Sequence, residues 1–168
     1  MSPFEADVRR LLDLEEIKSL KYKYCHYNDG GWPAQPQSHQ GPSADLFTED
    51  GVWDGSPGLP IAEGREEIRR LFARFASLFP MAYHAVMNPL IRIDGDAAQA
   101  HWHIMSASEI VNGRASLSIS AYDDEYVRTA AGWRIRSMRL LAGRSTVLPN
   151  GWREVAARAP AAESRPAQ

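Results

Sequence analysis

The feature that most constrains the fold is a series of four strand-like segments that fills the second half of the chain. The segments cover residues 82–93, 97–110, 115–127 and 133–141. They are joined by short turn sequences, namely Asp94-Gly95-Asp96, Asn112-Gly113 and a four-residue segment that ends at Gly132. Separators of this kind favour tight hairpins, because Gly and Asn reach the positive φ values that such turns require. The sequence therefore predicts a meander of long antiparallel strands.

Two segments before the meander have the apolar spacing of helices. Between residues 3 and 26 the apolar and aromatic residues recur at intervals of three and four, which is the helical period. This helix is expected to end near Asn28-Asp29-Gly30-Gly31, where turn-forming residues precede two glycines. The same period runs from residue 66 to 79 and stops at Pro80. Helices followed by strands are typical of an α+β domain, in which the helices cover one face of the sheet and the concave face encloses a pocket.

The remaining segments are short, and several are rich in Pro, Gly, Gln and Ser. They are predicted to form an exposed loop over 32–43, a short helix over 43–48, a short strand over 51–55 and a second loop over 55–60. Residues 1–148 are expected to form a single domain. Residues 149–168 form a short C-terminal extension whose Ala- and Pro-rich end is expected to be disordered.

The charge balance argues against nucleic-acid and membrane partners. Nineteen Lys and Arg face twenty-one Asp and Glu, and the net charge of −2 is too small to gather phosphates or anionic lipids. No apolar run is long enough for a signal peptide or a transmembrane span. Cys25 is the only cysteine, which excludes an internal disulfide and a Cys-based zinc cluster. A cytoplasmic protein is therefore expected.

Five segments in this order resemble a known family. They are residues 14–29, 46–53, 64–68, 84–98 and 126–135, which include Leu46-Phe-Thr-Glu-Asp-Gly-Val-Trp, Gly64-Arg-Glu-Glu-Ile and Asn88-Pro-Leu-Ile-Arg-Ile-Asp-Gly-Asp. Together they are similar to the SnoaL-like branch of the nuclear-transport-factor-2-like superfamily. The resemblance implies a cone-shaped α+β barrel, in which a curved, mixed and mostly antiparallel sheet wraps around N-terminal helices and encloses an apolar pocket.

Within that branch the chain most resembles the bile-acid dehydratases, the scytalone dehydratases and the lindane dehydrochlorinases. These enzymes eliminate a leaving group without a metal or cofactor. The resemblance implies that Asp29, at the end of the first helix, orients His84 on the first long strand, and that His84 removes a proton. It also implies a catalytic role for Tyr24, five residues before the Asp.

The chemistry of these residue types agrees with those roles. Histidine titrates near neutral pH, and a neighbouring carboxylate such as Asp29 fixes its tautomer and stabilises the imidazolium. Elimination also needs a donor for the departing oxygen or for a developing enolate, which a tyrosine hydroxyl, a second His or an Arg could provide. The residues expected to line the substrate pocket are Tyr27, Trp53, His101, His103 and Arg139.

The pocket assignments leave alternatives open. His101 and His103 share one face of their strand, which faces either the cone or solvent. In some relatives an arginine on the last strand contacts the leaving group, and either Arg139 or Arg144 could match it here. The tyrosines and Trp53 could equally be packing residues.

Asp29 and His84, the proposed catalytic dyad, also have other interpretations. Asp29 could serve only the turn at the helix end, and His84 could be a hydrogen-bonded structural residue. A minority interpretation joins the histidines and Asp29 in a metal site.

Three functions remain open at this level. The first is a lyase that acts on a hydrophobic small molecule, most simply a dehydratase. The second is an isomerase or polyketide-cyclase-like enzyme that uses the same base. The third is a module that binds a small molecule or a protein without catalysis. In every case a homo-oligomer, a dimer or a trimer, is expected, because the outer face of a curved sheet carries apolar residues.

Overall fold

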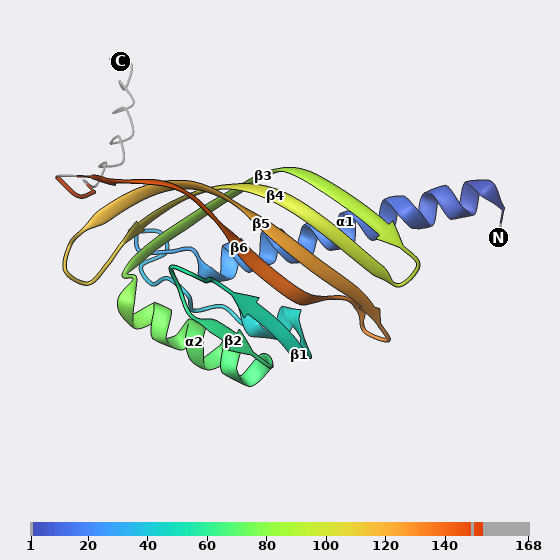
Figure 1. Ribbon diagram of the computed structural model, residues 1–168, viewed down its shortest axis with the longest axis horizontal. Helices are drawn as coiled ribbons and strands as arrows, with labels where there is room; N and C mark the ends of the chain where they lie inside the picture. Colours follow the sequence, from blue (N-terminus) through green and yellow to red (C-terminus); the bar gives the residue numbers. More distant parts are fainter. Residues whose placement is uncertain (1, 149, 153–168) are drawn as a thin grey trace, which may run out of the picture.

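The computed structural model describes residues 2–148 and 150–152. One six-stranded mixed sheet curves over the helices, and its strand order is β2-β1-β6-β5-β4-β3 (Figure 1). The strands are β1 (Phe47–Asp54), β2 (Ile61–Glu63), β3 (Met81–Asp94), β4 (Ala97–Glu109), β5 (Ala115–Thr129) and β6 (Gly132–Leu148). Only β1 and β6 run parallel, and β3 to β6 form the predicted antiparallel meander. The sheet is open, since no pairing joins β2 to β3.

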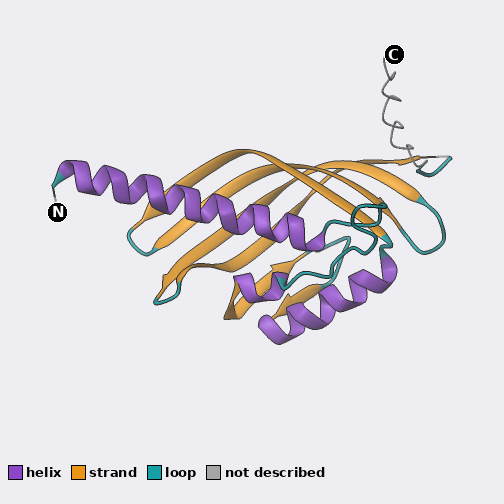
Figure 2. Ribbon diagram, turned by 180° about the vertical axis from the view of Figure 1, so that it is seen from behind, coloured by secondary structure: helices purple, strands orange, loops and turns teal. Residues whose placement is uncertain are grey.

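The helices lie against the concave face of this sheet. They are α1 (Pro3–Asn28), the short 3₁₀ helix η1 (Ser43–Leu46) and α2 (Arg65–Leu78). Figure 2 shows α1 crossing in front of the strands, with its first turns projecting past the edge of the sheet. Leu11 and Leu12 lie on these turns and are exposed, whereas Ile17 and Leu20 are buried further along. The N-terminus is closed by a capping box between Ser2 and Glu5, which satisfies free backbone donors of the first turn.

Most of the predicted elements are confirmed within a few residues. Three differences have physical causes. Strand β2 was not predicted, because its three residues are too few to show a period. Strand β6 continues to Leu148, beyond the predicted end at residue 141, because β5 is long enough to pair with the extra segment. The expectations for residues 153–168 lie outside the described residues.

The third difference is the loop over 32–43, which was predicted to be exposed. Part of it is packed against the domain, since the Ser38 side chain is buried and its hydroxyl donates to the carbonyl of Phe79. The backbone N–H of His39 donates to the carbonyl of Asn28 at 3.0 Å. The loop is therefore anchored to the end of α1 and to the segment that precedes β3.

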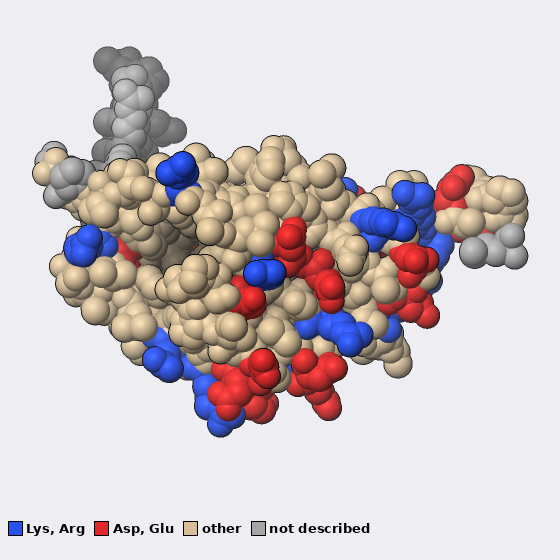
Figure 3. Space-filling view, in the orientation of Figure 1, with Lys and Arg blue, Asp and Glu red and all other residues tan. Residues whose placement is uncertain are grey.

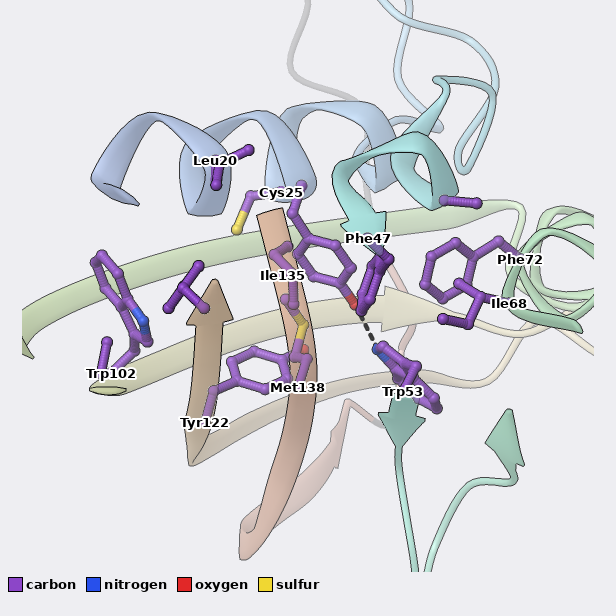
Figure 4. Close-up of a cluster of buried hydrophobic side chains, with 14 of the residues drawn as sticks. Leu20, Cys25, Phe47, Trp53, Ile68, Phe72, Trp102, Tyr122, Ile135 and Met138 are labelled. Atoms are coloured by element: carbon purple, nitrogen blue, oxygen red, sulfur yellow. Dashed lines mark hydrogen bonds between the residues drawn. The ribbon is translucent and has the colours of Figure 1, made fainter. Parts of the chain in front are cut away.

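The core fills the space between α1, α2 and the concave face. Its largest fully buried side chains include Trp102, Trp133 and Phe47. Figure 4 shows residues of this cluster arriving from α1, α2 and the strands, with Trp53 pointing toward a tyrosine hydroxyl of α1. A core built from one helix face and one sheet face is the expected solution for an α+β domain.

The surface carries both charge signs. Figure 3 shows Lys and Arg interspersed with Asp and Glu on one face, without a large patch of either sign. Among the described helices, none combines the length and the apolar character that a membrane crossing requires.

Candidate active site

Asp29 and His84 come together because the chain pairs with the sheet immediately after α1. Gly30 and Ala82 exchange two backbone hydrogen bonds of 2.9 and 3.0 Å. Gly30 is required here by close approach, since a Cβ at this position would lie 2.1 Å from the carbonyl oxygen of Gln37. Asp29 immediately precedes this bridge and His84 lies two residues beyond it, so both side chains are delivered to the same place.

The two side chains make direct contact. Nδ1 of His84 lies 2.7 Å from Oδ1 of Asp29, and the side chains are 16% and 12% exposed. A carboxylate only accepts, so Nδ1 carries a hydrogen and donates it to Asp29. In the neutral imidazole, Nε2 of His84 then has a lone pair and can take a proton.

Tyr24 lies beside this pair on α1. The ring centroids of Tyr24 and His84 are 6.4 Å apart, and the ring of Tyr122 packs edge-on against Tyr24 at 6.2 Å. The indole N–H of Trp53 donates to the Tyr24 oxygen at 3.0 Å, which is the dashed contact in Figure 4. Burial raises the pKa of the Tyr24 hydroxyl well above its ordinary value. The phenol therefore keeps its proton at neutral pH and remains a hydrogen-bond donor.

A pocket of about 530 Å³ opens over these residues. Tyr24, His84 and Trp53 line it. One wall is aromatic and apolar, and the other is rich in hydroxyl groups from β4, β5 and β6. The apolar wall contains Leu59, Phe72, Phe75 and Phe79, and the hydroxyl-rich wall contains Ser106, Ser108, Ser116, Ser118, Ser120 and Ser145. The volume suits a small organic molecule.

His39 is a pocket residue that the sequence analysis missed. It comes from the anchored loop, with its ring against Phe75 at 5.8 Å and Phe79 at 6.1 Å. Burial, together with the charge of His84, lowers its pKa to about 3. No periodic pattern surrounds His39, so nothing in the sequence could place its side chain.

Two histidines expected in the pocket lie elsewhere. His101 and His103 are on the outer face of β4, where His101 contacts Asp123 at 2.7 Å and His103 contacts Asn88 at 3.3 Å. The reason is strand alternation, since the buried Trp102 and Ile104 take the inward positions between and beyond them. The expected pocket placement of both histidines is therefore corrected.

Two further residues expected in the pocket are also outside it. The side chain of Arg139 is 61% exposed and lies 3.5 Å from Asp54 at the outer face, whereas Arg144 lines a separate surface depression near residues 55–59. Tyr27 lies one turn from Tyr24 and packs against Gly41 of the loop. Of the five residues proposed as substrate contacts, Trp53 is the one that lines the pocket.

The minority interpretation of a metal site is not supported by the described residues. Within 2–148 and 150–152, no three His, Cys, Asp or Glu side chains converge in a way that could hold a metal ion. His101 and His103 lie on the opposite face of the sheet from His84.

The fold and the site together define an α+β domain in which a histidine with a carboxylate partner lines a pocket. The chain belongs to the family described as the SnoaL-like domain, whose model matches residues 9–139. The fold is the cone-like, nuclear-transport-factor-2-like fold, as in a solved protein described as having a cystatin-like fold. The family and the fold predicted from the sequence are therefore confirmed.

The curated relatives are less informative. An uncharacterized protein of Mycobacterium tuberculosis is 30% identical over 93 residues, which cover 54% of this chain. The matched part spans 63% of the length of that relative.

Several solved structures have a similar fold. A protein of Novosphingobium aromaticivorans, provisionally named an aromatic ring hydroxylase, is 26% identical with a TM-score of 0.68, covering 86% of this chain and 96% of its own. A hexachlorocyclohexane dehydrochlorinase of Novosphingobium barchaimii is 18% identical with a TM-score of 0.74, covering 90% and 99%. A protein of Novosphingobium aromaticivorans, provisionally named a scytalone dehydratase, is 19% identical with a TM-score of 0.70, covering 93% and 97%. At 18% and 19% identity, the latter two likenesses establish the fold alone.

Proposed function

We propose that this protein is a lyase that eliminates water or a similar leaving group from a mainly apolar small molecule. The observation that carries the proposal is the 2.7 Å contact of Asp29 with His84, which lines a pocket together with Tyr24. Structural neighbours named as a dehydratase and a dehydrochlorinase support the same class of reaction. The pocket is large enough for a ligand of two or three fused rings.

In the proposed reaction, Nε2 of His84 removes a proton from a carbon atom beside the leaving group. The electron pair of the broken C–H bond forms the new double bond while the bond to the leaving oxygen breaks. Asp29 stabilises the imidazolium through Nδ1–H, and the Tyr24 hydroxyl donates a hydrogen bond to the departing oxygen. His84 then returns its proton to that oxygen, and water leaves.

The same base would also support isomerisation, in which the proton is returned to another carbon of the ligand. One observation keeps this second candidate in view, because the Tyr24 phenol retains its proton and could stabilise an enolate oxygen by donating to it. The two reactions differ in product mass. Elimination of water makes the product lighter than the substrate by the mass of one water molecule. Isomerisation leaves the mass unchanged.

The test is turnover by the wild type and by dyad variants on a panel of cyclic β-hydroxy ketones, analysed by mass spectrometry. We expect loss of water from at least one compound. Replacing His84 with Ala should lower kcat by about 10²- to 10⁴-fold, and Asp29→Asn should lower it too, while thermal melting shows that both variants stay folded. Full activity of the His84→Ala variant would refute the mechanism.

Exchange in D₂O gives a second readout that does not depend on the leaving group. Deuterium incorporation beside the carbonyl of the same ketones, followed by NMR, reports proton abstraction directly. If neither exchange nor turnover occurs with any compound, the non-catalytic binding module is the better description.

A further inference from the structure

A row of serine hydroxyls begins beside His84 and crosses the hydroxyl-rich wall of the pocket. In the register of the sheet, His84 of β3 pairs with Ser106 of β4, Ser106 with Ser118 of β5, and Ser118 with Ser145 of β6. All four residues line the same pocket. We call Ser106, Ser118 and Ser145 the hydroxyl row. Since β3 to β6 lie side by side, the row runs across the strands away from the dyad (Figure 1).

The serines do not fill the interior as other inward residues do. Further along the same faces the inward positions hold Trp102, Ile104, Tyr122 and Met138, which are buried in the core. The small serine side chains leave the cavity open, which alanine would do equally well. The hydroxyl groups therefore need a separate explanation.

The hydroxyls have unused hydrogen-bonding capacity. The oxygens of Ser106 and Ser118 are 2.7 Å apart, so one hydroxyl donates to the other. Each hydroxyl has one hydrogen and two lone pairs. After the bond between them, the two serines together still have one hydrogen and several lone pairs free for a ligand. The described residues provide no further partner for either oxygen. The opposite wall, with Phe72 and Phe75, is apolar.

We infer that the hydroxyl row binds an oxygen-bearing edge of the ligand and holds that edge beside His84. The inference rests on the proposed function and narrows its substrate class. The ligand is a ring compound with one apolar face and one edge of hydroxyl or carbonyl oxygens. A halogenated hydrocarbon offers weak partners to these hydroxyls, so an oxygen-bearing compound fits the pocket better than a halogenated one.

The experiment compares two probes of similar size, 2-naphthol and 2-methylnaphthalene, in fluorescence titrations of the full chain. The measured quantity is the ratio of the two dissociation constants, because the ratio cancels the shared contribution of the apolar rings. In the double variant Ser106→Ala/Ser118→Ala, affinity for 2-naphthol should fall about 3- to 10-fold relative to 2-methylnaphthalene, as expected for lost neutral hydrogen bonds.

A matched control is Ser137→Ala, which removes a hydroxyl from the outer face of β6 and should keep the wild-type ratio. The single variant Ser118→Ala repeats the test if melting curves show that the double variant is unfolded.

Three outcomes would overturn the inference. They are an unchanged ratio in the hydroxyl-row variants, an equal change in the Ser137→Ala control, and failure of the wild type to bind either probe. A His84→Gln variant separates this inference from the proposed function, because it should lose turnover and keep the probe ratio. If the ratio of dissociation constants is the same in all serine variants, the inference fails, but a loss of turnover in His84→Gln would still support the proposed function.

Discussion

At the residue scale, two histidines in one pocket have different hydrogen-bond partners. His84 donates from Nδ1 to the carboxylate of Asp29. Among the described residues, the hydrogen-bond partner of the His39 ring is the Ser38 hydroxyl, at 3.1 Å from Nδ1. The hydroxyl hydrogen of Ser38 is already donated to the carbonyl of Phe79, so Nδ1 of His39 must be the donor. Of the two imidazoles, His84 is thus the one with a carboxylate partner.

The lowered pKa of His39 predicts a pH dependence of stability. The pKa is about 3 in the folded chain, and the ordinary value near 6.5 applies when the chain is unfolded. Between these values the unfolded state binds more protons, so the free energy of unfolding should rise with pH across this window. His39→Asn, which tolerates the positive φ of 56° at this position, should reduce the slope by at most about 1.4 kcal/mol per pH unit.

Urea unfolding of the wild type and His39→Asn at several pH values from 4 to 7 measures this slope. Imidazole ¹⁵N shifts of the wild type provide an independent check, because His39 should remain neutral with its proton on Nδ1 throughout. Equal slopes in the two proteins, or titration of His39 near neutral pH, would contradict the assignment.

At the element scale, α1 is fastened to the sheet by two ion pairs. Asp13 accepts two hydrogen bonds of 2.7 Å from Arg128 of β5, and this contact lowers the pKa of the Asp13 carboxyl. Lys21 lies 2.9 Å from Asp124 of β5, and both side chains are completely buried. The Lys21 ammonium also lies 3.5 Å from the ring centroid of Tyr122, a pocket residue. The helix that carries Tyr24 and Asp29 is thus held in place by contacts outside the pocket.

The buried pair predicts strong non-additivity between its two members. Lys21→Met leaves the Asp124 carboxylate buried without its counter-ion and should lower the free energy of unfolding by about 3–5 kcal/mol. Lys21→Met/Asp124→Asn removes both charges, and Tyr126, which donates to Asp124 at 2.8 Å, keeps an acceptor. The double variant should therefore be at least about 1 kcal/mol more stable than the single one. Urea denaturation at pH 7 measures both, and additive losses would count against a buried charge pair.

At the scale of the whole molecule, the two faces of the sheet serve different purposes. The concave face holds the core and the pocket. On the outer face, Met105 pairs in register with Ile119 of β5, and these side chains are 38% and 63% exposed. Tyr83 and Met87 on the same face of β3 are exposed as well. Exposed apolar residues that gather on one face are typical of a surface that another protein covers.

The homo-oligomer expected from the sequence stays a prediction, and this face gives it a test. Light scattering of the wild type should give the mass of a dimer or a trimer. Ile119→Glu should shift the protein toward monomer, because it places a charge in the apolar area. The control is Ile61→Glu. Ile61 is 54% exposed and lies on β2, away from the apolar residues of β3 to β5, so this change should leave the mass unchanged. A monomeric wild type would refute the prediction.

The sequence by itself determined most of the elements. Helical spacing, glycine-containing turns and strand alternation are local properties, so they placed α1, α2 and the meander, apart from the end of β6. The resemblance to the family pointed to Asp29 and His84. The fold brings them to 2.7 Å through the bridge between Gly30 and Ala82.

Only the tertiary structure decided which side chains face the pocket. Alternation shows that His101 and His103 share a face, but burial of Trp102 decided that this face is outside. His39 entered the pocket through a loop whose path depends on distant anchors at Asn28 and Phe79. The hydroxyl row joins three strands through a register set by pairing across the sheet, which no local pattern records.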